Sequence, residues 1–136
     1  MRLLLDTHVF LWMQVTPERL GRSLALVEDT ANELILSAAS SWEIALKWAL
    51  GKLALPDPPD VYVPRRVQSS GVTTLPVEHS HALAVARLPM HHSDPFDRLL
   101  VAQARVERLR LVTVDPAFAT YDVDVVQVER KGSHDR

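Results

Sequence analysis

Short apolar segments alternate with longer segments of helical periodicity along the chain. Most of the short segments are rich in Leu, Ile and Val, which is typical of buried strands. In the longer ones, apolar residues recur three and four positions apart, as in helices that cover a sheet. The predicted strands are residues 2–6, 33–37, 72–75, 110–114 and 124–128, and the predicted helices are residues 7–14, 19–30, 40–50, 60–69, 77–88 and 95–108.

This alternation predicts an α/β fold with a central, mainly parallel β-sheet flanked by helices on both faces. The length of 136 residues fits a single domain and leaves no room for a second of ordinary size. We expect this domain to span residues 1–128. Residues 129–136 are mostly polar, so we expect a frayed C-terminal tail.

Two predicted helix starts carry a capping signal close to an acid. Ser40 and Glu43 have the spacing of a capping box, which predicts that Ser40 caps the helix containing Glu43. Asp94 followed by Pro95 is typical of a cap and a first-turn proline, which puts Asp97 at the third position of its helix. Glu43 and Asp97 are therefore both expected in a first helical turn.

Four acids are expected at one rim of the sheet. Asp6 and Asp115 end or directly follow predicted strands, at the carboxyl ends of those strands. In a parallel α/β sheet the connecting helices begin at that same edge, and ligands bind there. This places Glu43 and Asp97 beside the other two acids. The hydroxyl of Thr113 is predicted either to reach this site or to pack within its strand.

Each acid alone has an ordinary structural interpretation, as a capping-box residue, a partner of the helix dipole or a turn residue. Four carboxylates at one rim, however, repel one another, and a cation is the natural compensation. Because the ligands are all oxygen atoms, Mg²⁺ or Mn²⁺ fits and zinc does not. Such an ion predicts hydrolysis of a phosphodiester or of another phosphate ester.

The overall charge argues mildly against a nucleic-acid partner. The formal net charge is −2 and the isoelectric point about 6.3, whereas proteins that bind nucleic acids by bulk charge are usually basic. The arginines are expected on a solvated face, with a local basic surface as the alternative. They are Arg65, Arg66, Arg98, Arg105, Arg108 and Arg110.

Features of other protein classes are missing from the sequence. The chain has no cysteine, which excludes a disulfide scaffold and a thiolate zinc site. Asp6 and His8 interrupt the first apolar run too early for a signal peptide. No segment approaches the ~18 apolar residues of a membrane span. We therefore expect a soluble, cytoplasmic protein with no membrane partner.

Four segments, in their order along the chain, resemble the PIN-domain ribonucleases. They are LLLDTHVFLW, SAASSWEIALK, HHSDPFDRLLVAQA and LVTVDPAF, and they span residues 3 to about 118. Within that family they are similar to the VapC-type toxins of bacterial toxin–antitoxin pairs. The resemblance implies a PIN-like fold, Mg²⁺- or Mn²⁺-dependent endonucleolytic cleavage of RNA, inhibition by a small cognate antitoxin protein, and a homodimer, alone or within a toxin–antitoxin complex.

The resemblance also implies roles for the acids. Asp6, Glu43, Asp97 and Asp115 match the four catalytic, metal-binding acids of the family, of which the fourth is the least strictly needed. Asp6 and Asp97 are expected to bind the principal ion, and Glu43 and Asp115 to orient water or complete a second metal position. Asp94 keeps two interpretations, a plain helix cap or a residue that supports the metal site indirectly.

Histidines and apolar residues offer further candidates. His91 and His92 look like metal ligands, but adjacent histidines usually point apart; His92 is an alternative contact for a substrate phosphate. His79 and His81 are expected at the surface or partly buried.

The predicted helix 7–14 is more apolar than one buried face needs, so part of it is predicted to contact an antitoxin or a second protomer. We expect the three tryptophans to pack in the core or at a partner interface and not to stack on bases. They are Trp12, Trp42 and Trp48.

Two other functions are compatible with an acid at this rim. A non-enzymatic, receiver-like Mg²⁺-binding regulatory module needs an acid pair near the first strand and a lysine after the last core strand. Asp6 has no such acidic neighbour, and no lysine follows Asp115 at that place. An aspartyl-phosphate phosphatase needs an acid two residues after Asp6, where the chain has His8. The sequence favours the ribonuclease over both.

Overall fold

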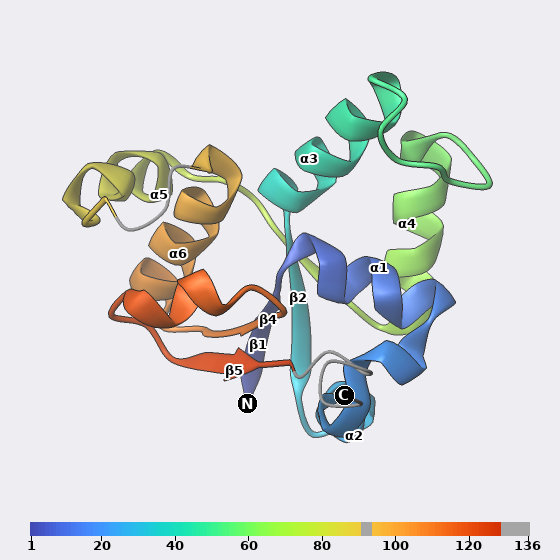
Figure 1. Cartoon of the computed structure of the whole chain (residues 1–136), viewed down its shortest axis with the longest axis horizontal. Coiled ribbons are helices and arrows are strands. Elements are labelled where there is room, and N and C mark those ends of the chain that lie inside the picture. Colours follow the sequence, from blue (N-terminus) through green and yellow to red (C-terminus); the bar gives the residue numbers. More distant parts are fainter. Residues whose placement is uncertain (91–93, 129–136) are drawn as a thin grey trace, which may run out of the picture.

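The computed structural model describes residues 1–90 and 94–128, and its centre is a sheet of five parallel strands in the order β3-β2-β1-β4-β5 (Figure 1). The predicted α/β fold is therefore confirmed. The predicted tail 129–136 and the pair His91 and His92 lie outside the described residues. The strands are β1 (Arg2–Leu5), β2 (Glu33–Ser37), β3 (Thr73–Leu75), β4 (Arg110–Thr113) and β5 (Val125–Gln127).

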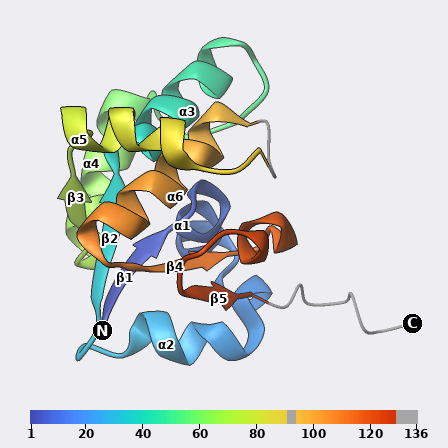
Figure 2. The same cartoon turned by 90° about the vertical axis from the view of Figure 1, so that its left-hand side faces the viewer.

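Helices connect the strands and cover both faces of the sheet (Figures 1 and 2). Within the described ranges, none of them is long and apolar enough to cross a membrane. The α-helices are α1 (Thr7–Val15), α2 (Leu24–Glu28), α3 (Ala38–Ala49), α4 (Pro59–Ser70), α5 (His79–Ala84) and α6 (Pro95–Glu107). The 3₁₀ helices are η1 (Pro17–Ser23), η2 (Val85–Arg87) and η3 (Pro116–Thr120).

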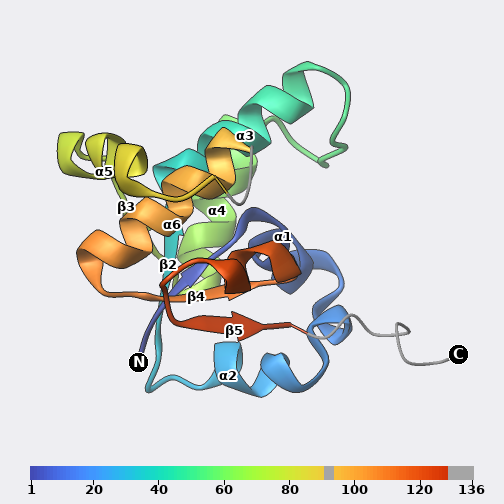
Figure 3. The same ribbon diagram turned by 60° about the vertical axis from the view of Figure 1, so that its left-hand side comes forward.

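The alternating side chains of β1 divide the hydrophobic core between the two faces of the sheet. Leu3 and Leu5 belong to a cluster with side chains of α1, α2 and α4, whereas Leu4 belongs to a cluster with side chains of α6 and η3. All three leucines are fully buried. Because consecutive strand residues point to opposite faces, one short strand holds both layers of helices in place. Helix α5 packs against α6 on the side away from the sheet (Figure 3).

Helix α3 begins before the residue predicted to cap it. Ser37, the last residue of β2, has an extended backbone, and its Oγ accepts a hydrogen bond from the backbone N–H of Ala39 at 3.0 Å. The chain therefore turns into the helix directly at the end of the strand. Ser40 lies buried inside the helix, and Glu43 falls in the second turn. The predicted capping box of Ser40 and Glu43 is wrong.

Two other predicted helices are divided. The segment 19–30 is divided between η1 and α2, and its backbone is broken inside η1 at Gly21, whose φ of 54° interrupts a right-handed helix and suits glycine. The segment 77–88 starts later, at His79, and is split into α5 and η2. The short helix η3 follows β4 where the pattern of apolar residues indicated no helix.

Candidate active site

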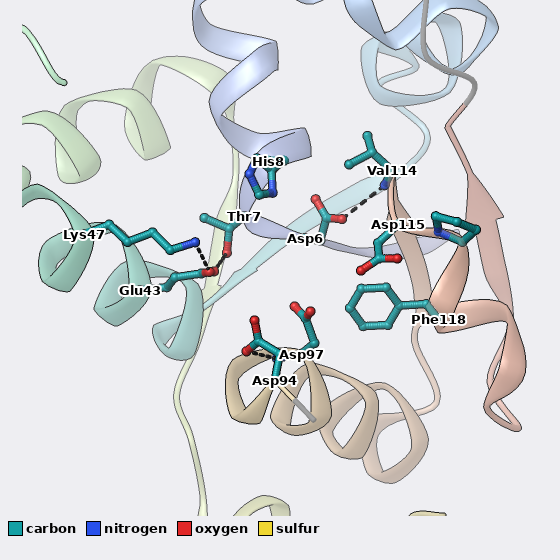
Figure 4. Close-up of a pocket in the computed structure, with 11 residues that line it drawn as sticks. Asp6, Thr7, His8, Glu43, Lys47, Asp94, Asp97, Val114, Asp115 and Phe118 are labelled. Atoms are coloured by element: carbon teal, nitrogen blue, oxygen red, sulfur yellow. Dashed lines mark hydrogen bonds and ion pairs between the residues drawn. The ribbon is translucent and has the colours of Figure 1, made fainter. Parts of the chain in front are cut away.

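A pocket of about 510 Å³ opens at the carboxyl edge of the sheet, where β1 and β4 end and α3 and α6 begin (Figure 4). All four acids predicted for the site line it, although they come from four separate parts of the chain. The predicted convergence of these four acids at one edge of the sheet is therefore confirmed, and their catalytic and metal-binding roles stay predictions. The lining residues are Asp6, Thr7, His8, Glu43, Lys47, Asp94, Asp97, Val114, Asp115, Pro116 and Phe118.

Three hydrogen bonds hold the carboxylate of Asp6. This residue follows β1 and caps α1, with Oδ1 accepting the backbone N–H of Val9 at 2.8 Å. Its Oδ2 accepts the hydroxyl of Thr113 and the backbone N–H of Val114, the latter at 3.2 Å. Of the two alternatives left open for Thr113, the structure shows the contact with a residue of the site. The side chain is thereby fixed from the start of α1 and from the end of β4, and Asp6 is only 4% exposed.

Burial raises the pKa of Asp6 above its ordinary value of 3.8. The hydrogen bonds from Thr113, Val9 and Val114 and the charge of His8 favour the anion and oppose this rise. The cost of burial is the larger effect. The Asp6 carboxylate therefore lacks part of the stabilisation that water gives a carboxylate, and a cation in the pocket would supply it.

Glu43 projects from the second turn of α3 and is also buried, with an exposed fraction of 4%. Its Oε1 accepts the hydroxyl of Thr7 at 2.5 Å, and its Oε2 accepts a hydrogen bond from the Lys47 ammonium at 2.7 Å (Figure 4). Both carboxylate oxygens are thus engaged by side chains of the protein. The Thr7 contact joins the start of α1 to α3 at the edge of the pocket.

Asp94 and Asp97 lie at the start of α6. Asp94 is the helix cap: its Oδ1 accepts the backbone N–H groups of Phe96 at 2.9 Å and of Asp97 at 3.4 Å. The capping interpretation of Asp94 is therefore confirmed, while its indirect support of a metal remains a prediction. Asp97 occupies the third position of α6, as predicted, and both carboxylates project into the pocket (Figure 4).

Asp115 follows β4 and caps η3. Its Oδ1 accepts the backbone N–H of Ala117 at 2.9 Å, and its own backbone N–H donates to the Thr113 hydroxyl at 3.0 Å. Thr113 therefore contacts two of the acids, donating to the carboxylate of Asp6 and accepting from the backbone of Asp115. The short helix η3, absent from the sequence prediction, orients the fourth acid and brings Phe118 to the wall of the pocket.

Lys47 is a pocket residue that the sequence analysis did not assign. It lies one helical turn after Glu43, so the i, i+4 spacing of an acid and a lysine was the available signal. The hydrogen bond to Glu43 raises the pKa of Lys47, partial burial lowers it, and the charges of Glu43, Asp94 and Asp97 add to the rise. The ammonium group therefore lies in the field of three acids.

The acids do not meet as a preformed metal cage. In the part of the chain that the structure describes, no group of three or more His, Asp or Glu side chains is arranged so that it could hold a metal ion. The hydrogen bonds described above turn Asp6, Glu43, Asp94 and Asp115 towards donors of the protein itself. The donor set nevertheless fits Mg²⁺ or Mn²⁺, because these ions take oxygen ligands and often bind through only one or two carboxylates.

Several predictions made outside the pocket need correction. His81 was expected to be at least partly exposed, but it is fully buried and its Nε2 lies 2.7 Å from the Glu107 carboxylate. Arg98 is buried instead of solvated, because its guanidinium donates to the carbonyl groups of Val85, Leu88 and Pro89. This arginine holds the end of η2 against α6.

The tryptophans divide between the core and the surface. Trp12 is partly buried, packs against the core cluster of Leu3 and Leu5, and lies under the guanidinium of Arg19. Trp42 and Trp48 are 60% and 39% exposed, so the core interpretation is wrong for them. Their role at a partner interface remains a prediction.

In α1, Val9 and Phe10 are fully buried and residues 11–13 pack partly against the core, which uses much of the apolar surface that a partner was predicted to cover.

Comparisons with known proteins agree with this fold. The family model of the PIN domain matches residues 3–124. Ribonuclease VapC22 of Mycobacterium tuberculosis is 32% identical over 113 residues, which cover 82% of this chain and 85% of that protein. Ribonuclease VapC16 of the same organism is 41% identical over 68 residues, which cover 50% of this chain and 48% of that protein.

A solved structure supports the same architecture. VapBC2 from Rickettsia felis, bound to a DNA fragment from its promoter, aligns over 95% of this chain and 100% of the matched chain with a TM-score of 0.69. At 13% identity this likeness shows the fold alone. The family model, by contrast, covers nearly the whole chain, and VapC22 is similar over most of its length. The chain therefore belongs to the PIN-domain family, as the four sequence segments implied, and is similar within it to VapC ribonucleases.

Proposed function

We propose that this protein is a divalent-metal-dependent endoribonuclease and the toxin of a toxin–antitoxin pair. The observation that carries the proposal is the pocket at the carboxyl edge of the sheet, in which Asp6, Glu43, Asp97 and Asp115 meet. A chain of the PIN-domain family with this set of carboxylates, and with similarity to ribonucleases over most of its length, fits hydrolysis of RNA phosphodiester bonds better than any other reaction.

In this proposal Asp6 and Asp97 hold the principal Mg²⁺ or Mn²⁺ ion, and Glu43 and Asp115 orient water or complete a second, weaker position. Such an ion activates water and stabilises the negative charge that develops on a phosphate during in-line displacement. Asp94 contributes by capping α6, which fixes the helical turn from which Asp97 projects.

The surrounding residues orient the acids. The Thr113 hydroxyl and the Val114 N–H fix Oδ2 of Asp6, and the Val9 N–H fixes Oδ1, so this carboxylate keeps one orientation. The Thr7 hydroxyl does the same for Oε1 of Glu43. Carboxylates held in this way keep their orientation when an ion and a phosphate enter, which favours catalysis.

The proposed partners are an RNA substrate, a small antitoxin protein and a second copy of the chain. The antitoxin follows from the similarity to VapC ribonucleases and to the VapBC2 fold. The homodimer follows from the family resemblance. The receiver-like regulatory module loses its basis, because the family model of the PIN domain covers residues 3–124.

The test is cleavage of a total RNA pool by the purified, antitoxin-free protein with Mg²⁺, with Mn²⁺ and with EDTA. We expect discrete fragments that vanish with EDTA and fall at least about a hundredfold in Asp97→Asn, since a removed ligand or orienting group in a metal site costs about ten- to a hundredfold or more. Asp122→Asn is the matched control, because it removes the same charge at an exposed position outside the pocket.

Two outcomes would contradict the proposal. Folded protein that binds Mn²⁺ but cleaves no RNA in the pool would argue against the nuclease. Full metal-dependent cleavage by Asp97→Asn would argue against the assigned site. The antitoxin is tested separately, by asking whether a small protein encoded beside this one copurifies with it and suppresses cleavage.

A further inference from the structure

Lys47 places a positive charge in a pocket whose lining includes five acids. Its ammonium lies 2.7 Å from Oε2 of Glu43, while its side chain keeps 41% of its surface exposed. The Glu43 side chain, in contrast, is only 6% exposed. A nearly buried carboxylate is costly unless it is paired, so Lys47 supplies a compensation that water cannot.

The same ammonium also interacts with the acids at the start of α6. The charges of Asp94 and Asp97 act on Lys47 together with that of Glu43. Lys47 therefore compensates charge from both helices that border the pocket, α3 and α6. Among the described residues that line the pocket, it is the only lysine or arginine.

Both carboxylate oxygens of Glu43 are already engaged by donors of the protein. The Thr7 hydroxyl engages Oε1, and the Lys47 ammonium engages Oε2. A divalent ion approaching Glu43 meets a positive charge already in place, and the two cations repel each other at short range.

We propose that Lys47 is a built-in counter-cation, which neutralises Glu43 in the metal-free protein and is displaced when a divalent ion binds. The inference rests on the proposed function, because it takes the acids to be a metal site. The long, half-exposed lysine side chain can swing towards solvent at little cost, which makes the exchange reversible. Lys47 thereby raises the metal concentration that the site requires.

The test is calorimetric titration of Mn²⁺ into metal-free wild type and Lys47→Met, which keeps an unbranched side chain one atom shorter and removes its charge. We expect Lys47→Met to bind Mn²⁺ about tenfold more tightly, because the competitor is gone and Glu43 is left uncompensated until the ion arrives. In EDTA the same variant should unfold at a lower temperature than wild type, and Mn²⁺ should raise its unfolding temperature more.

Two variants control this comparison. Lys47→Arg keeps the charge and should bind Mn²⁺ within about twofold of wild type, a small change on the scale of tenfold per 1.4 kcal/mol. Lys52→Met removes a charge from an exposed lysine outside the pocket and should leave the affinity unchanged. If Lys52→Met also bound Mn²⁺ more tightly than wild type, the net charge of the protein would account for the tighter binding, which would overturn the inference.

The remaining outcomes separate the inference from the proposed function. If wild type binds Mn²⁺ and Lys47→Met binds it equally or more weakly, the counter-cation is disproved while the metal site stands. If neither protein binds Mn²⁺, the metal-dependent function fails and this inference fails with it. Should Lys47→Met fold only when Mn²⁺ is added, that rescue would support the exchange of cations; no rescue, with wild type binding normally, would overturn it.

Discussion

The carboxyl group of Asp6 shows how one side chain serves both structure and chemistry. Its two oxygens accept hydrogen bonds from the start of α1 and from the end of β4, which ties together two segments more than a hundred residues apart. The same packing removes the carboxyl group from water. Burial is the dominant effect and raises its pKa above 3.8. The residue that joins α1 to β4 is therefore also one that a cation would stabilise.

This raised pKa predicts a pH dependence of stability in the metal-free protein. Between the ordinary pKa and the raised one, the folded state binds more protons at Asp6 than the unfolded state does. The contribution of Asp6 to stability is therefore fully present below pH 3.8 and is lost as the pH rises through the raised pKa. Relative to Asp6→Asn, which cannot titrate, wild type should become less stable as the pH increases over this window.

The measurement is urea denaturation of both proteins in EDTA at a series of pH values. The hydrogen bonds that the amide loses shift the difference in unfolding free energy by a nearly constant amount, so the trend with pH reports on Asp6. A difference that stays constant, or that moves in favour of wild type as the pH rises, would show that the carboxyl group is not held in its protonated form by burial.

At the scale of one element, α6 depends on its first residues. Asp94 caps the helix, Pro95 occupies the first position, and Asp97 presents its carboxylate to the pocket from the first turn. The other end closes with Arg108 in the left-handed region, at a φ of 56°. The position of Asp97 thus depends on where α6 starts, and Asp94 determines that point.

We expect Asp94→Ala to lower the free energy of unfolding by about 0.5–2 kcal/mol, the usual cost of removing a helix cap. Asp94→Ser should lose less than half as much, because a serine hydroxyl can accept the same backbone hydrogen bonds. Urea denaturation in EDTA checks both values without contributions from metal. Equal losses for Ala and Ser would mean that the charge of Asp94, and not its capping hydrogen bonds, stabilises the helix.

At the scale of the whole molecule, stability comes from two apolar layers that share one sheet. Leu4 lies on the central strand β1 and packs against α6 and η3, while its neighbours Leu3 and Leu5 pack on the opposite face. The pocket sits at the edge where these two layers meet the ends of the strands. Loss of either layer should therefore loosen the site as well as the fold.

Leu4→Ala should lower the free energy of unfolding by about 2–5 kcal/mol, since the side chain is fully buried and its removal leaves a cavity. This is a large share of the ~5–15 kcal/mol typical of a domain. Leu83→Ala, at a position that is 71% exposed, makes the same chemical change and should cost less than about 0.5 kcal/mol. Similar losses in the two variants would refute the assigned core.

The local pattern was enough to predict most elements and the set of acids at the rim. Short apolar runs mark β1, β2 and β4, and capping residues mark the start of α6. Two predictions of helix boundaries failed because of the local backbone. Ser37 caps α3 in place of Ser40, and the φ of Gly21 divides a predicted helix.

The sequence by itself determined the alternation of strands and helices, and hence the edge at which Asp6, Glu43, Asp97 and Asp115 come together, because periodicity and topology are encoded by neighbouring residues. Only the tertiary structure decided the partners of these acids. Thr113 and Asp6 are 107 positions apart, and Thr7 and Glu43 are 36 apart. Burial and hydrogen bonds between distant residues depend on how the layers pack. That packing makes Asp6 a weaker acid, buries Arg98 and brings the ammonium of Lys47 in among the carboxylates.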